Sequence, residues 1–287
     1  MKRVLWVSLW GALAMTSILV FNACRTVPET GRRQLALVSA EQELQLGLAA
    51  FDEIKEETPI SKNPKDNALV SRVGARIAAQ AAKDLPNAQW EFVVFDSPEA
   101  NAFCLPGGKV GVYEGLIPIA QNEAGLATVI GHEVAHAAAH HGGERMSRAM
   151  AAQGLGQALG ASITDPRWQQ VTMIAYGLGA NVGYELPQSR GNESEADHIG
   201  LMYMARAGYD PEEAIRFWER FSEHHKGASG PPAFLRTHPM DSRRIADLRR
   251  LMPEAKAEYQ RAKMGGAAPE TPTGKGEPTR GSTIISR

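Results

Sequence analysis

The strongest chemical pattern in the chain is the pentapeptide His132-Glu133-Val134-Ala135-His136. Residues four apart lie on one face of an α-helix, so both imidazoles could reach a single metal ion. Glu133 lies about a hundred degrees round the helix, where its carboxylate could act on a water held by that ion. Zinc hydrolases use this spacing, with the glutamate as general base. The pattern therefore predicts one Zn²⁺ ion per chain, with His132 and His136 as ligands and Glu133 as a catalytic residue.

The alternative is an ordinary amphipathic helix whose polar residues face water. The surrounding residues argue against it, because they leave little polar surface; they include Leu126, Val129, Ile130, Val134 and the alanines at 127, 135 and 137–139. A mostly apolar helix should not bury two histidines and a glutamate unless these side chains have a partner. The context therefore favours a metal site.

A catalytic zinc ion needs a third protein ligand. His140 and His141 are the nearest candidates, but a straight helix carries His140 away from a metal already held by the first two histidines. The pattern HExxHxxGxxH also fails, because Ala139 and Gly142 stand where its glycine and last histidine would be.

Two carboxylates farther along the chain are better candidates. Glu193 and Asp197 are four residues apart on a predicted helix. One carboxylate could bind the metal while the other orients a ligand histidine. The alternative is a solvated acidic helix start, where carboxylates interact favourably with the helix dipole.

Five motifs occur in one order: Asn101-Ala102-Phe103, Leu105-Pro106-Gly107-Gly108, the histidine motif, the Glu193–Asp197 pair and Thr237-His238-Pro239. This order resembles the gluzincin metallopeptidases that include HtpX, the CAAX prenyl proteases and the periplasmic proteases BepA and LoiP. The resemblance runs from about residue 30 to about residue 251, and it points to the soluble, secreted branch. It implies an α+β, mainly α, zincin-like domain with a small β-sheet beside the HExxH helix. It also implies that Glu193, rather than Glu195, is the third zinc ligand.

His238 precedes Pro239, which biases it towards an extended conformation and lets its ring project from a loop. The imidazole could then donate to the reaction's oxyanion or occupy the open metal position. Alternatively, His238 only caps a helix that begins near Asp241. The related periplasmic proteases suggest a latch, with Arg244 as its accompanying arginine. We expect Asp197 and Arg244 to support the ligands from outside the metal's coordination sphere.

The N-terminus has the pattern of a secretory signal. Lys2 and Arg3 precede an uncharged stretch, 4–22, that ends before Cys24. A cysteine at this point predicts a lipoprotein signal over 1–23, with Cys24 as the lipidated residue. An uncleaved membrane anchor and an ordinary cleaved signal are the alternatives. All three place the domain outside the cytoplasm; we expect the periplasm, with a lipid anchor in the outer membrane of a Gram-negative bacterium.

Composition narrows the function further. The 287 residues carry a formal net charge of −1, which gives no basic surface for nucleic acid. With Cys24 lipidated, Cys104 has no partner, so no disulfide is expected. We expect one metallopeptidase domain over 30–263. The proline- and glycine-rich residues 264–287 predict a disordered tail.

Local signals predict a mostly helical chain. Ser39 with Gln42 forms a capping box, and further helix starts are expected at Asn63-Pro64, Asn122, Asp210-Pro211 and after Asp241. Short strands are expected at 90–95 and 109–113. The stretch 154–183 is rich in glycine and alanine and predicts either a packed helix or a mobile cover over the site.

The strand at 109–113 lies just before the metal helix, which makes Val110, Gly111 and Val112 a candidate edge for pairing with an extended substrate. A plain core strand is the alternative. Backbone pairing gives weak sequence preference, as suits a protease for quality control of unfolded or misassembled envelope proteins. The resemblance points the same way. An envelope assembly chaperone with a latent zinc site, and a zinc hydrolase of non-peptide substrates, remain alternatives.

Overall fold

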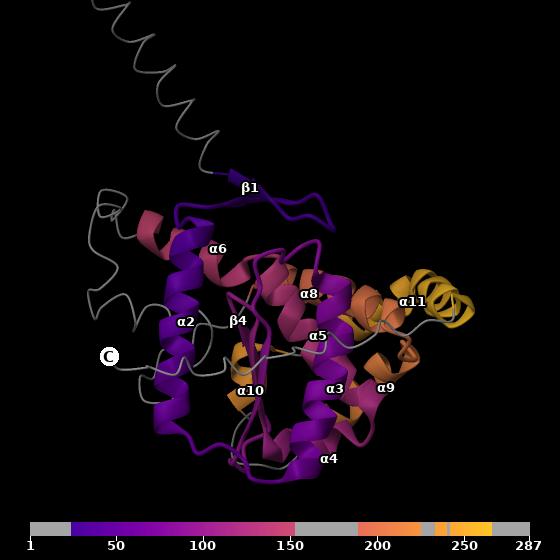
Figure 1. The fold of residues 1–287 in the computed structure, drawn as a ribbon. Helices are drawn as coiled ribbons and strands as arrows, with labels where there is room; N and C mark the ends of the chain where they lie inside the picture. The colour runs from indigo at the N-terminus through magenta and orange to yellow at the C-terminus, as the bar shows by residue number, and fades with distance from the viewer. Residues whose placement is uncertain (1–23, 153–188, 225–232, 240–241, 266–287) are drawn as a thin grey trace, which may run out of the picture.

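The computed structural model describes residues 24–152, 189–224, 233–239 and 242–265. It shows a mainly helical α+β fold with two small sheets, which confirms the predicted fold class (Figure 1). The strands are β1 (Cys24–Thr26), β2 (Arg33–Leu35), β3 (Glu91–Phe95), β4 (Ala102–Leu105) and β5 (Lys109–Tyr113). The helices are α2 (Ala40–Glu57), α3 (Pro64–Ala81), the 3₁₀ turn η1 (Glu114–Leu116), α4 (Ile117–Ala120), α5 (Glu123–Ala138), α6 (His141–Ala152), α8 (Arg190–Arg206), α9 (Glu212–His224), α10 (Ala233–Thr237) and α11 (Ser242–Met264).

Polar caps set the predicted helix starts. The Ser39 hydroxyl accepts a hydrogen bond from the backbone of Gln42, whose side chain accepts one in return from the backbone of Ser39. Asn63 caps α3 with Pro64 at the first helical position. Asn122 caps α5, the helix that carries the HExxH motif. These starts are confirmed.

The larger sheet has the strand order β3-β5-β4, with β5 parallel to β3 and antiparallel to β4. The expectation that Val110, Gly111 and Val112 form an open edge is therefore wrong, because β5 is the central strand and pairs on both sides. The strand β4 was not predicted from the sequence. A tight turn with Gly107 at φ 88° and Gly108 at φ 78° folds β4 back onto β5 and covers the position expected for substrate.

The sheet is packed on both faces, as Figure 1 shows with α2 on one side and α3 and α5 on the other. Alternate residues of each strand face opposite ways, so the sheet supplies two apolar clusters. Phe95, Phe103 and Leu105 pack with Phe51 of α2, whereas Cys104 packs in the large core with the helices on the other face. The predicted small sheet thus lies directly beside the HExxH helix.

Two glycines set the distance between α5 and α8. A Cβ atom on Gly200 would lie 2.8 Å from the backbone nitrogen of His132, and one on Gly131 would lie 3.0 Å from the carbonyl oxygen of Gly200. Contacts this short are not available to larger residues, so the pair lets the two backbones cross almost in contact. The crossing brings residues of α8 next to the histidines of α5.

Cys24 and Cys104 are not joined by a disulfide in this structure. Within the part of the chain that the structure describes, no helix is long and apolar enough to span a membrane. The signal predicted over 1–23, the stretch 154–183 and nearly all of the predicted tail lie outside the described residues.

Candidate metal centre

The HExxH residues lie on α5, which is buried along almost its whole length. His132, Glu133 and His136 are 2%, 4% and 6% exposed, so none of them faces water as an amphipathic helix would require. Burying these polar groups is unfavourable unless they meet partners. The other elements of the fold supply those partners.

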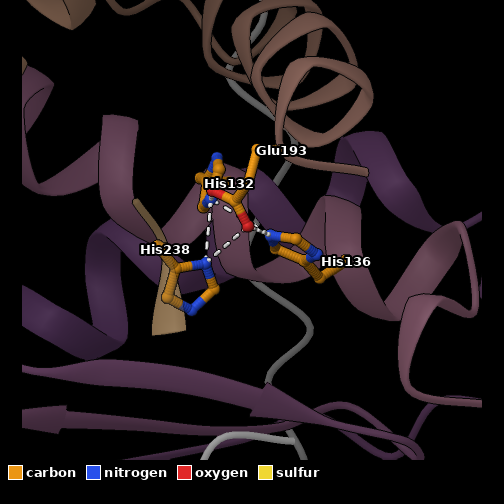
Figure 2. A group of neighbouring side chains, drawn as sticks. All are labelled: His132, His136, Glu193 and His238. Carbon is orange, nitrogen blue, oxygen red and sulfur yellow. Dashed lines mark hydrogen bonds and ion pairs between the residues drawn. The ribbon is translucent and has the colours of Figure 1, made fainter. Parts of the chain in front are cut away.

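Four side chains bring one ligand atom each into a buried group: His132, His136, Glu193 and His238 (Figure 2). Glu193 comes from the first turn of α8, and His238 directly follows α10. The four ligand atoms lie within 4.8 Å of one another. The structure therefore brings together residues more than a hundred positions apart that the sequence singled out separately.

Four of the six distances between these atoms are close to those of a tetrahedral metal site. Zinc bonds of 2.0–2.1 Å place neighbouring ligand atoms roughly 3.3 Å apart. Nε2 of His132 lies 3.1 Å from Nε2 of His136 and 3.4 Å from Nδ1 of His238. Oε1 of Glu193 lies 3.4 Å from Nε2 of His136 and 3.1 Å from Nδ1 of His238. Two imidazoles, a carboxylate and a third imidazole at this spacing fit a single metal ion.

Asp197 and Arg244 hold the group from outside. Oδ1 of Asp197 lies 3.0 Å from Nδ1 of His132, the ring nitrogen that faces away from the ligand cluster. Arg244 binds Asp197 through two nitrogens at 2.6 and 2.7 Å, and its third nitrogen lies 2.9 Å from Oε2 of Glu193. Arg244 thus connects the candidate ligand Glu193 to Asp197, which lies against the candidate ligand His132.

His238 points into the cluster. Its ring stacks on Phe234 at a centroid distance of 4.5 Å, and its backbone nitrogen donates to the Phe234 carbonyl. Nε2 of His238 lies 3.6 Å from Oε1 of Glu133. The ring therefore faces the ligand cluster and Glu133.

Comparison with known proteins matches residues 64–252 to the model of peptidase family M48. The chain belongs to peptidase family M48. Mitochondrial metalloendopeptidase OMA1 of Schizosaccharomyces pombe is 35% identical over 90% of this chain and 75% of its own length. The Saccharomyces cerevisiae OMA1 is 32% identical over 86% of this chain and 74% of its own length. The β-barrel assembly-enhancing protease of Escherichia coli is 28% identical over 79% of this chain and 47% of its own length.

The expected gluzincin resemblance is thus confirmed, and this M48 chain is a metalloendopeptidase whose buried cluster offers ligands for a single metal ion. The relatives differ in setting, since one group is named for mitochondria and the other for β-barrel assembly. The family assignment therefore leaves the compartment of this chain open.

Burial and local charges shift the acid–base properties of the M48 site. Burial would lower the pKa of His132, but hydrogen bonds to Asp197 and Glu193 outweigh it and raise this pKa to about 9. Burial holds the pKa of His136 well below its usual range. Burial raises the pKa of Glu133. A carboxylate with a raised pKa accepts a proton more readily near neutral pH.

The two histidines that follow α5, His140 and His141, are not among the cluster's ligands. His140 adopts φ 52°, which turns the chain after α5 and directs its ring to Glu43. His141 lies instead behind the cluster, with Nδ1 2.8 Å from Nδ1 of His136. This contact was not predicted from the sequence, because only the path of a straight helix was considered, which carries His140 away from the metal. Glu195 binds His141 and faces away from the metal ligands.

Proposed function

We propose that this chain is a zinc endopeptidase in which His132, His136 and Glu193 hold the metal and Glu133 is the general base. The observation that carries the proposal is the buried tetrahedral spacing of the ligand atoms, with the Glu133 carboxylate beside them. Oε1 of Glu133 is buried and makes no hydrogen bond within the described residues. A buried carboxylate oxygen without a partner is costly, which suits a group whose partner is a reacting water.

The chain's residues would divide the reaction between them. A zinc ion bound here supplies a Lewis acid that polarises the scissile carbonyl and lowers the pKa of water from about 15.7 towards about 7. Glu133 takes a proton from the attacking water and delivers it to the leaving amine. Asp197 keeps the proton of His132 on Nδ1, so that Nε2 presents its lone pair to the cluster.

His238 acts as a latch in this proposal. A zinc enzyme needs one open position for water and substrate, and Nδ1 of His238 stands among the ligand atoms where that position would be. Its other ring nitrogen faces Glu133. One imidazole therefore covers both the open position and the general base, so cleavage requires that His238 move away.

An extended peptide would pair with β4 rather than β5. Within the described residues β4 pairs only with β5, and it packs against α5, which carries two of the metal ligands. Backbone pairing at this edge would hold a substrate beside the metal with little sequence preference. All four residues of β4 are buried, so substrate entry also requires the chain to open there.

The proposed substrates are misfolded or misassembled envelope or outer-membrane proteins, with the enzyme held at a bacterial membrane through a lipid on Cys24. Two observations support this role. Relatives from Escherichia coli and Vibrio cholerae are named for β-barrel assembly. Cys24 opens β1 of the folded domain, directly after the predicted signal.

The test is digestion of a permanently unfolded protein, such as reduced and carboxymethylated lactalbumin, by the purified chain. We expect cleavage that a zinc chelator abolishes and that added Zn²⁺ restores. Cleavage that persists after the metal has been removed would contradict the proposal. An assembly chaperone with a latent zinc site would instead keep its function in cells when Glu133 is replaced by glutamine.

A further inference from the structure

The metal helix α5 is followed by two histidines whose rings lead away from the ligand cluster to the N-terminal hairpin. Each histidine contacts a buried carboxylate, and each carboxylate binds an arginine of the segment 24–35, which forms β1, β2 and their connecting turn. This hairpin lies beside α2 and α6 at one end of the molecule (Figure 1). The two series of contacts are His140–Glu43–Arg25 and His141–Glu195–Arg32.

Within the described residues, only the second series of contacts, through His141, reaches a metal ligand. Nδ1 of His141 lies 2.8 Å from Nδ1 of His136, and Nε2 of His141 lies 2.9 Å from Oε2 of Glu195. Glu195 also accepts hydrogen bonds from Nε of Arg32 at 2.7 Å and from the hydroxyl of Thr30. His141 is completely buried, so water cannot replace these contacts.

The hydrogen-bond directions are consistent with one another. Nε2 of His136 faces the ligand cluster, so a neutral His136 that binds metal carries its proton on Nδ1. That proton is donated to Nδ1 of His141, which must then carry its own proton on Nε2. Nε2 of His141 donates in turn to the Glu195 carboxylate, which accepts. A donor and an acceptor meet at each step from the metal ligand to Glu195.

The N-terminal hairpin is held in place by further hydrogen bonds. Arg32 binds Glu144 of α6 through two nitrogens at 3.0 and 2.9 Å, in addition to Glu195. The side chain of Gln34 donates to the carbonyl of Ala139, at the end of α5, at 2.8 Å. The hairpin is therefore fastened both to the helix that carries the ligands and to the carboxylate that holds His141.

We propose that His141 is a positioning residue for the metal ligand His136, and that Thr30 and Arg32 of the N-terminal hairpin hold Glu195 so that it can fix His141. The proposal rests on the zinc site proposed above. Hydrogen bonding to the outer nitrogen of a ligand histidine fixes its ring and increases its basicity. The hairpin lies outside residues 64–252, so part of this chain's metal centre lies beyond the segment that matches the family model.

Substitutions at His141 separate its two contacts. Asparagine places an acceptor oxygen near the position of Nδ1, which faces His136, whereas glutamine reaches the position of Nε2, which faces Glu195. Phenylalanine preserves the volume and offers neither atom. The readouts are the zinc affinity of the metal-free protein, by competition with a chromophoric chelator, and the visible absorption spectrum of the Co²⁺-loaded protein. Neither readout requires catalysis.

We expect His141→Phe and His141→Gln to weaken zinc binding about 10–100-fold, which is typical when a ligand histidine loses the partner of its outer nitrogen. His141→Asn should bind zinc more tightly than both and keep a Co²⁺ spectrum closer to that of the original protein. His140→Phe is the matched control, because it loses the equivalent carboxylate contact at the same helix end without touching a ligand. Equal zinc affinities for His141→Phe and His140→Phe would overturn the proposal, and so would weaker binding by His141→Asn than by His141→Gln.

A second pair of variants covers the case in which a substitution at the buried His141 prevents folding. The side chains of Arg32 and Arg25 are 31% and 25% exposed, and each binds one of the two carboxylates. Arg32→Gln should weaken zinc binding, whereas Arg25→Gln should not. Equal affinities would refute the role of the hairpin. If the proposed zinc site itself is wrong, the unsubstituted protein will bind no zinc, and this result is distinguishable from equal affinities of the two arginine variants.

Discussion

Replacing Asp197 with asparagine tests how the site holds its first histidine. Asp197 is 4% exposed, and its two oxygens meet Arg244 at 2.6 and 2.7 Å and His132 at 3.0 Å. Asparagine keeps the volume and one acceptor but removes the negative charge. Weakening the contact of a carboxylate with the outer nitrogen of a ligand histidine costs about 10–100-fold in metal affinity, or about 1.4–2.8 kcal/mol.

The same substitution removes half of a buried ion pair. Breaking such a pair costs about 3–5 kcal/mol of folding stability, because the remaining charge stays buried. Arg244 keeps Glu193 as a second partner at 2.9 Å, so we expect a loss of about 3 kcal/mol, near the lower end of that range. Urea unfolding of the metal-free protein measures this stability, and chelator competition measures zinc affinity.

The matched control is Asp52→Asn on α2. Asp52 pairs with Lys55, the side chain of Asp52 is 71% exposed, and such surface pairs contribute about 0–1 kcal/mol. We expect zinc affinity unchanged from the original protein. An Asp197→Asn variant that matched this control in both affinity and stability would refute our account of how His132 is oriented.

Three further outcomes are expected. Glu193→Ala should lose bound zinc in metal analysis, whereas Glu195→Ala should still be purified with close to one zinc per chain despite a lower affinity; the opposite pattern would exchange their roles. His238→Ala should keep its zinc and cleave an unfolded protein faster, whereas slower cleavage would favour the oxyanion role and an unchanged rate would exclude both. Cys24→Ala should move the protein from the membrane to the soluble fraction of cells, and a variant that stays membrane-bound at full length would indicate an uncleaved anchor.

Local sequence signals were sufficient for the parts of the site that one helix provides. Asn122 marks the start of α5, and the spacing within the helix places His132 and His136 side by side. Glu193 and His238 were found as separate motifs, and their meeting depends on the tertiary fold. The glycines at the α5–α8 crossing make that meeting possible, but a glycine in a helix does not reveal which backbone approaches it.

The sheet order could not be derived in the same way. The strand at 109–113 is short and apolar, a pattern that fits either an edge or a central strand. Its position was decided by β4, four buried residues without the alternation that marks a half-exposed strand. Pairing depends on which strand is available as a partner, and this information lies outside the strand itself.

The contact between His141 and His136 shows a similar limit. It exists because His140 takes a left-handed backbone conformation and starts a new helix in a different direction. Left-handed conformations favour glycine, so a histidine gives little warning of such a turn. The strands β1 and β2, which support this contact, have three residues each and no alternating pattern long enough to detect.

We propose that Glu133 performs the acid–base chemistry at a metal held by other residues. Glu133→Gln isolates this role, because glutamine preserves the shape of the side chain and removes its ability to accept a proton. Zinc content and cleavage of an unfolded protein are measured on the same preparation. We predict close to one zinc per chain and no detectable cleavage. Cleavage at the rate of the original protein, with zinc retained, would show that Glu133 is not the general base.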